Sequence, residues 1–280
     1  MLDRITLTAG EVRAELRPDA GGRIGQIEVA GRRLLRGEHD SDGGWLAWGS
    51  YPLVPWSNRI AAGRFVFEGA TYQMPVNFDD GTALHGLGAQ APWEVTAHDA
   101  VAAVLELSID HSPFLLSARQ EFQLTPDRLV QTLQVTNRAS RRVPVGLGIH
   151  PWFPAGPIAV PASAHWPLVD ALPVGPIEAF SPRPGVPELA VPGVLDHCLT
   201  GLTGRRANVP GLTLEWSDEI AHVVVYTAVP GWQCVEPVTN ANDGFNLAAA
   251  GAAGHGVVTL GPGESSSATF GFVWEPAHAV

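Results

Sequence analysis

Short runs of alternating apolar and polar residues, separated by turn residues, recur along almost the whole chain. The first two runs, Ile5 to Thr8 and Val12 to Leu16, flank Ala9-Gly10-Glu11 and predict a β-hairpin. Within Leu129 to Asn137, apolar residues recur at the period of two that a strand requires. We find no amphipathic helix of about ten residues or more and no sequence repeat. The pattern therefore predicts roughly twenty short strands and an all-β fold.

The length and composition suit such a fold. With 280 residues, 45% of them hydrophobic, the chain can form one large domain or two ordinary ones. Its 31 glycines and 24 prolines show no repeat, which favours frequent turns over collagen or disorder. We predict a single large antiparallel β-sandwich over residues 1–280. Two smaller β domains that meet near residue 150 are the alternative.

The charge and the cysteine content exclude several classes of partner. The net charge of −11 argues against nucleic acid and against an anionic membrane, since both need a basic face. The N-terminus has no signal-peptide pattern, and no apolar run is long enough to cross a membrane. Cys198 and Cys234 form neither a disulfide framework nor a metal-binding pattern, which suits a reducing cytosol. A neutral small molecule or another protein remains open as the partner, and we expect a cytoplasmic protein, monomer or homodimer.

One carboxylate, that of Glu236, lies between the end of a predicted strand and a proline. The apolar run His222 to Val229 predicts a strand, Pro230-Gly231 a turn, and Trp232 to Val235 a second strand that delivers Glu236. Pro237 has no N–H to donate, so we expect regular pairing to end there. Glu236 is then either a rigidly placed base beside a ligand or a surface turn cap, and this segment alone favours neither.

Four further polar residues lie at predicted strand ends or in loops: His85, His150, Arg59 and Asp196. A histidine titrates near neutral pH and a carboxylate can accept a proton, so together they could move protons at two atoms of one ligand. Because the chain has ten histidines, most of them must have no such role.

Aromatic residues lie near the same points. An aromatic ring can stack on the C–H face of a sugar, although simple core packing explains most tryptophans. The tryptophans concerned are Trp45, Trp48, Trp56, Trp152 and Trp232. Competing motifs are weak: Gly251 to Gly256 lacks the lysine of a phosphate loop, and no histidine pair has metal-ligand spacing. His197 and Cys198 are strand neighbours that point to opposite faces, so they are unlike a catalytic dyad.

Five short segments, taken in order, resemble the motifs of the aldose 1-epimerases, the galactose mutarotase family. They are Asn58-Arg59-Ile60, Leu84-His85-Gly86, His150-Pro151-Trp152-Phe153, Asp196-His197-Cys198-Leu199, and Cys234-Val235-Glu236 with Asp243-Gly244-Phe245-Asn246 after it. Each match is weak by itself, but their order along nearly the whole chain is specific.

The resemblance implies a fold, an activity and a set of roles. It implies one large antiparallel β-sandwich with an open cleft. Glu236 would be the general base at the anomeric O1 hydroxyl, and His150 the general acid at the ring oxygen. The other substrate-binding positions implied are Arg59, His85, Asp196, Asn58, Trp152 and Gln233. This chemistry calls for no cofactor and no metal.

The sequence also departs from the family pattern. Gly146 replaces an asparagine that is frequent there, Trp152 replaces a tyrosine, and Gln233 lies close to Glu236. These changes leave the acid–base pair intact and leave the preferred sugar open. A related branch acts on acidic sugars such as sulfoquinovose or a hexose 6-phosphate, although few extra arginines lie near these motifs. The rival hypotheses are a non-catalytic sugar-binding protein and a glycoside hydrolase that uses Glu236 with Asp196.

Overall fold

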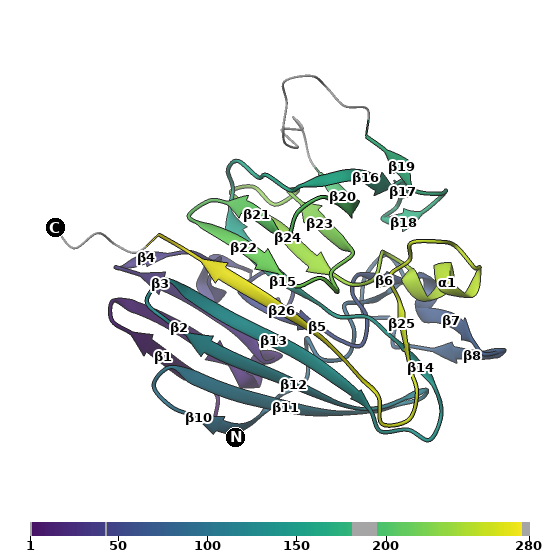
Figure 1. Cartoon of the computed structure of the whole chain (residues 1–280), viewed down its shortest axis with the longest axis horizontal. Coiled ribbons are helices and arrows are strands. Elements are labelled where there is room, and N and C mark those ends of the chain that lie inside the picture. Colours follow the sequence, from purple (N-terminus) through teal and green to yellow (C-terminus); the bar gives the residue numbers. More distant parts are fainter. Residues whose placement is uncertain (1, 43, 181–194, 276–280) are drawn as a thin grey trace.

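Two large antiparallel sheets form the body of the protein. The structure is a computed structural model that describes residues 2–42, 44–180 and 195–275. The larger sheet has 11 strands in the order β1-β2-β3-β5-β15-β24-β23-β20-β16-β19, with β4 added beside β3 (Figure 1). Its strands are β1 (Ile5–Ala9), β2 (Val12–Arg17), β3 (Arg23–Val29), β4 (Arg32–Arg33), β5 (Ser50–Leu53), β15 (Gly148–Pro154), β16 (Ala162–Trp166), β19 (Glu178–Ala179), β20 (Asp196–Leu202), β23 (His222–Tyr226) and β24 (Trp232–Val238).

The second sheet has seven strands in the order β10-β11-β12-β13-β26-β22-β21. Its strands are β10 (Glu94–His98), β11 (Ala102–His111), β12 (Phe114–Leu124), β13 (Arg128–Asn137), β21 (Arg206–Val209), β22 (Leu212–Trp216) and β26 (Ser265–Val273). Both large sheets combine strands from before and after residue 150. The assignment of residues 1–280 to a single domain stays a prediction. The prediction of a large antiparallel all-β fold is confirmed.

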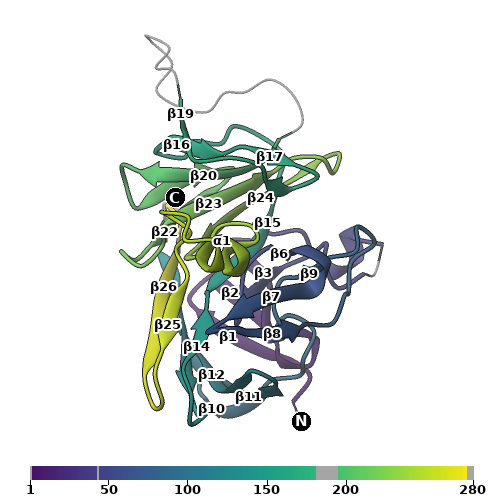
Figure 2. The same ribbon diagram turned by 90° about the vertical axis from the view of Figure 1, so that its right-hand side faces the viewer.

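Small elements gather at one end of the molecule, at the right of Figure 1. They are the strand pairs β6 (Arg59–Ile60) with β9 (Ala83–Leu84), β7 (Arg64–Phe67) with β8 (Ala70–Gln73) and β14 (Val143–Val145) with β25 (Val258–Leu260), and the helix α1 (Gly244–Ala249). A fourth pair joins β17 (Leu168–Val169) to β18 (Leu172–Pro173), and three 3-10 turns cover Pro18–Ala20, Glu38–Asp40 and Ala61–Gly63. Figure 2 shows α1 in front of the larger sheet.

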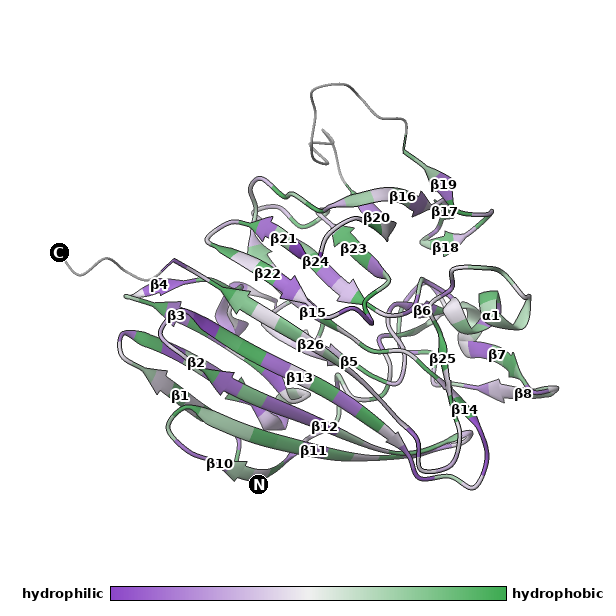
Figure 3. Cartoon of the chain, in the orientation of Figure 1, coloured by the Kyte–Doolittle hydropathy of each residue, from purple (hydrophilic) through white to green (hydrophobic). Residues whose placement is uncertain are grey.

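The alternation of the sequence separates two faces of the larger sheet. On one face, residues such as Leu7, Ile149 and Val235 join the core shared with the second sheet. On the other face, Tyr51, Trp152 and other residues form a separate cluster. The second sheet shows the same alternation, visible as green and purple bands on β11, β12 and β13 (Figure 3). Strand periodicity therefore leaves one face of the larger sheet free to carry a site.

Two expectations at the strand level are corrected. Pairing does not end at Pro237, because β24 continues to Val238 and Pro237 lies opposite Val223 of β23. A proline is compatible with this place because its missing N–H falls where pairing to the other neighbour, β15, is interrupted. The predicted strand from His222 to Val229 is also shorter and ends at Tyr226.

The proline-rich stretch from 154 to 192 contains β16, β17, β18 and β19. Its part from residue 181 onward lies outside the described residues. Within the described chain, no helix is long and apolar enough to cross a membrane.

Candidate active site

The ladder between β15 and β24 is interrupted in its middle. Gly148 pairs with Val238 and Trp152 pairs with Cys234, and both pairs belong to one register. The described residues between these two points make no cross-strand pair of this ladder. The two strands are therefore held at both ends of a short unpaired stretch.

Two prolines and the two catalytic candidates occupy this stretch. Pro151 on β15 and Pro237 on β24 each lack the N–H that a ladder bond needs. The register of the flanking pairs places His150 directly opposite Glu236 on the face away from the shared core. Their side chains meet, with His150 Nε2 at 3.2 Å from Glu236 Oε1. The register thus assembles an imidazole and a carboxylate from distant parts of the chain.

Both groups are almost fully buried, with 5% of His150 and 2% of Glu236 exposed. Burial disfavours the charged form of each, so it lowers the pKa of His150 to about 3 and raises the pKa of Glu236 well above its usual value. The repulsion from Asp196 raises the pKa of Glu236 further, whereas Arg59 opposes this rise. Burial thus favours the uncharged form of each group, a neutral imidazole and a protonated carboxyl.

His85 and Tyr51 complete the wall around His150. The Tyr51 ring stacks on the His150 ring at 4.6 Å between centroids, and His85 meets His150 edge-on at 4.8 Å. His85 has a φ of +61°, a left-handed conformation that costs energy in a residue with a side chain and is common at functional sites. The next residue, Gly86, must be a glycine because a Cβ there would lie 2.2 Å from the Val54 carbonyl oxygen. Close backbone packing thus fixes the direction of the His85 side chain.

The irregular segment around Trp45 covers this wall. The Trp45 ring lies 6.4 Å from the ring of His85 and 5.9 Å from that of Tyr51. Trp152 Nε1 donates to the Leu46 carbonyl oxygen at 2.7 Å, and Arg23 donates to the Trp45 carbonyl oxygen at 2.8 Å. The segment is therefore anchored by its backbone, while the Trp45 side chain faces the acid–base centre.

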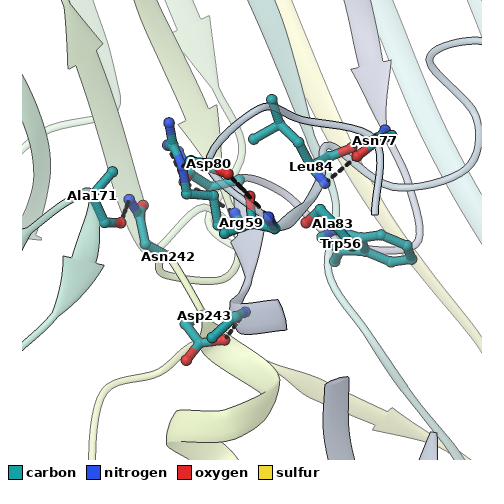
Figure 4. Close-up of polar contacts among 12 residues, drawn as sticks. Trp56, Arg59, Asn77, Asp80, Ala83, Leu84, Ala171, Asn242 and Asp243 are labelled. Carbon is teal, nitrogen blue, oxygen red and sulfur yellow. Dashed lines mark hydrogen bonds and ion pairs between the residues drawn. The ribbon is translucent and has the colours of Figure 1, made fainter. Parts of the chain in front are cut away.

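Arg59 is the first residue of β6, and Figure 4 shows it beside Asp80. Its Nε donates to Asp80 Oδ2 at 2.7 Å, and its Nη1 donates to Asn58 Oδ1 at 3.2 Å. Asn58 is itself left-handed, with a φ of +55°, and its carbonyl oxygen accepts from the His85 N–H at 2.9 Å. Asn58 therefore positions both Arg59 and His85. Arg59 Nη2 makes no hydrogen bond to any described residue, so it is available to a ligand.

Asp196 lies on the same face, at the start of β20. It pairs with Tyr226, which in turn is the neighbour of Cys234 along the sheet. Burial raises the pKa of Asp196, and the charge of Arg59 moderates this rise. The carboxylate therefore lies within electrostatic reach of both Arg59 and Glu236.

The glycine at position 146 has a structural explanation. A Cβ on Gly146 would lie 1.8 Å from Asn240 Oδ1, so the glycine makes room for that amide. Asn240 Oδ1 accepts from the N–H and the Oγ of Ser57, at 3.1 and 3.0 Å. This contact joins the segment after Glu236 to the segment that carries Arg59. The Asn240 side chain thus fills the space next to Gly146 that a side chain at position 146 would need, including the asparagine that is frequent there in the family.

Not every predicted residue joins the site. Gln233 lies one position from Cys234, so alternation directs it to the opposite face of β24 from Glu236. Trp152 does join, with its ring 5.7 Å from that of His150. Trp56 instead packs in the shared core against Phe114. The sequence motifs could not separate these cases because neighbours on a strand point to opposite faces.

Several residues of the site escaped the sequence analysis. Tyr51 and Arg23 belong to no quoted motif, although Tyr51 lies inside the aromatic stretch around Trp45. Arg23 is buried between the rings of Trp48 and Tyr51, at 4.2 and 5.0 Å, and its guanidinium hydrogen bonds reach only backbone carbonyl oxygens. A charged residue at the first position of the apolar strand β3 was the one signal that could have identified it.

Many buried polar atoms of this face lack a partner within the described chain. They are Tyr51 Oη, His85 Nδ1, His150 Nδ1, Glu236 Oε2 and Asn242 Oδ1. Buried polar groups are normally hydrogen-bonded, so such a set indicates a ligand rich in hydroxyl groups or ordered water. A nearby amide is already engaged, since Asn242 Nδ2 donates to the Ala171 carbonyl oxygen (Figure 4).

The fold and this face together define a β-sandwich of the galactose mutarotase-like class. A family model described as aldose 1-epimerase matches residues 3–272. The chain therefore belongs to the aldose 1-epimerase family, as its motifs predicted.

Known proteins agree with this membership. The crystal structure of a proposed aldose 1-epimerase from Escherichia coli K12 superposes with a TM-score of 0.85 at 26% identity, over 98% of this chain and 99% of that one. A galactose mutarotase-like protein from Clostridium acetobutylicum superposes with a TM-score of 0.80 at 22% identity, over 98% of this chain and 95% of that one. This likeness shows the fold alone.

In sequence, the uncharacterised Escherichia coli K12 protein YphB is 37% identical over 120 residues, which are 41% of each chain. The uncharacterised protein YihR of the same organism is 29% identical over 154 residues, 53% of this chain and 49% of YihR. The matched parts thus span less than half of each curated relative.

Proposed function

We propose that the protein is an aldose 1-epimerase that interconverts the α and β anomers of an aldose. One observation carries the proposal: a buried imidazole and carboxylate lie 3.2 Å apart, on a face where several buried polar atoms lack partners among the described residues. The anomeric O1 and the ring oxygen O5 are bonded to the same carbon, C1. An acid and a base that serve these two oxygens must therefore be neighbours, as His150 and Glu236 are.

In ring opening, the Glu236 carboxylate takes the proton of the O1 hydroxyl and the protonated His150 donates one to O5. The C1–O5 bond breaks as the C1=O1 double bond forms, which gives the free aldehyde. The C1–C2 bond then rotates. In closure, His150 takes the proton back from O5 and Glu236 returns its proton to O1, so that the pair is regenerated on the other anomer.

The proton count of the pair fits this cycle. Burial favours a neutral imidazole and a protonated carboxyl, which together hold the same single proton as the working ion pair. Sugar hydroxyls can donate hydrogen bonds to the Glu236 carboxylate, and the charge of Arg59 also favours its ionised form. Substrate binding would therefore move one proton across the pair without exchange with solvent.

The remaining residues would bind and orient the sugar. Arg59 Nη2, His85 and Asp196 would contact its hydroxyls, and the rings of Trp45 and Trp152 would pack on its C–H faces. Mutarotation already proceeds in water, so positioning and paired proton transfer could supply most of the acceleration. The test is NMR exchange spectroscopy across a panel of aldoses, with His150→Gln as the inactive comparison. Wild-type exchange no faster than in buffer for every sugar would leave a sugar-binding protein instead.

An acidic sugar is the second candidate substrate, and one feature favours it. The Arg36 guanidinium lies 5.4 Å from the ring of Trp152, which itself lies beside His150, and 5.5 Å from the ring of Trp232. Its Nε donates to the Asp40 carbonyl oxygen at 2.9 Å, and its other guanidinium nitrogens make no hydrogen bond to a described residue. The panel should therefore include a hexose 6-phosphate and sulfoquinovose. Turnover of these sugars that falls in Arg36→Gln, while glucose turnover does not, would support an anionic substrate.

A further inference from the structure

Three residues of the site form a ligand set of a different kind. His85, His150 and Glu236 each offer one ligand atom, and these atoms all lie within 4.8 Å of one another. All three residues are buried, and they follow or belong to different strands, β9, β15 and β24. Two imidazole nitrogens with one carboxylate oxygen are the ligands that hold zinc in many enzymes.

Each of the three residues also keeps one polar atom without a partner. These atoms are His85 Nδ1, His150 Nδ1 and Glu236 Oε2, which have no hydrogen-bond partner within the described chain. A neutral imidazole keeps a lone pair for a metal on one of its two ring nitrogens. A divalent cation would also balance the negative charge of the Glu236 carboxylate.

The spacing is close to what coordination requires. Ligand atoms about 2.0–2.2 Å from a tetrahedral metal lie roughly 3.4 Å from one another. His150 Nε2 and Glu236 Oε1 are already 3.2 Å apart. Only the wider separations within the 4.8 Å limit need to shrink. Asp196 adds negative charge nearby, which further favours a cation.

We infer that His85, His150 and Glu236 bind one zinc-class divalent ion, and that this ion inhibits the protein by occupying its acid and its base. Imidazole and carboxylate ligands favour Zn²⁺, Co²⁺ and Ni²⁺ over Mg²⁺ or Ca²⁺. The inhibitory part rests on the proposed epimerase function, whereas metal binding itself does not. The site would make turnover sensitive to free transition metal and restorable by a chelator.

Calorimetry with ZnCl₂ and the absorption bands of Co²⁺ test binding without any measurement of activity. Wild type should bind one ion per chain. Glu236→Gln and His85→Asn should each weaken binding by at least about 100-fold, since even outer-shell partners of a metal contribute 10- to 100-fold. Asparagine is chosen at position 85 because it tolerates the left-handed backbone there. The matched control is His98→Asn, an exposed histidine on β10, which should leave affinity unchanged.

Circular dichroism and thermal melting establish that each variant is folded before titration. Three results would overturn the inference. They are an equal loss of binding in His98→Asn, wild-type affinity in both site variants, and no ion bound by wild type. Mutarotation should fall in proportion to bound Zn²⁺ and return with EDTA, and activity that persists at full occupancy would overturn the inhibitory part. A wild type that binds zinc at this site but turns over no aldose would refute the epimerase function alone.

Discussion

The two faces of β15 and β24 contrast sharply although they share the same backbone. One face presents His150, Trp152 and Glu236, with several polar atoms unpartnered. The other presents Ile149, Phe153 and Val235 to the core shared by the two sheets. The side-chain period of two lets chemistry and stability be encoded at alternate positions. Substitutions on the two faces should therefore have separable effects, and the following experiments test that separation.

The largest effect is expected for Glu236→Gln. Loss of the base should lower kcat for anomer exchange by roughly 10²- to 10⁴-fold. The melting temperature should hold or rise, since the variant removes a buried ionisable group of nearly the same shape. NMR exchange and a thermal melt on the same sample measure both quantities. Turnover close to wild type would remove the assignment of Glu236 as the base.

Phe153→Ala tests the opposite face. It deletes a fully buried ring from the core and should lower the free energy of unfolding by about 3–5 kcal/mol. The kcat of the folded fraction should stay near that of wild type, because the ring points away from His150. Urea unfolding measures the free energy of unfolding, and an activity assay at low temperature measures kcat. A large loss of kcat with unchanged stability would break the separation of the faces.

His222 tests whether every buried histidine of the larger sheet serves chemistry. Neither of its ring nitrogens has a partner in the described chain, and burial lowers its pKa to about 4. The unfolded state then binds more protons, so stability should fall as pH drops from about 6.5 to 4, by about 3 kcal/mol at most. His222→Gln should flatten this decline in urea titrations with kcat unchanged. An equally steep decline in the variant would assign the acid sensitivity to other groups.

The smallest effect is expected at the rim. Asp80→Asn removes the ion pair with Arg59, which is partly exposed and contributes about 1 kcal/mol. KM should rise by about fivefold with kcat nearly unchanged, since Arg59 would lose orientation but not its charge. Glu121→Gln, which breaks an exposed pair with Arg119 on the second sheet, is the matched control. A change in kcat rather than KM would place Asp80 closer to the chemistry than we propose.

The sequence predicted the fold better than the arrangement of the site. Alternation and turn residues predict an all-β chain because they act locally, residue by residue. The pairing of His150 with Glu236 depends on the register of two strands far apart in the chain, and only the family motifs indicated it. The roles of Tyr51 and Arg23 depend on packing between segments, which no local pattern encodes. Gln233 was misplaced because closeness along a strand does not imply a shared face.

The unpaired stretch between β15 and β24 has a consequence for refolding experiments. His150 faces Glu236 only when Gly148 meets Val238 and Trp152 meets Cys234, and a slip by one residue would turn one partner to the opposite side. After dilution from denaturant, circular dichroism should recover as soon as strands form in any alignment. Enzymatic turnover should recover only when this one alignment is reached. Recovery of activity would thus report the correct register of β15 and β24, which a measurement of total β content cannot distinguish.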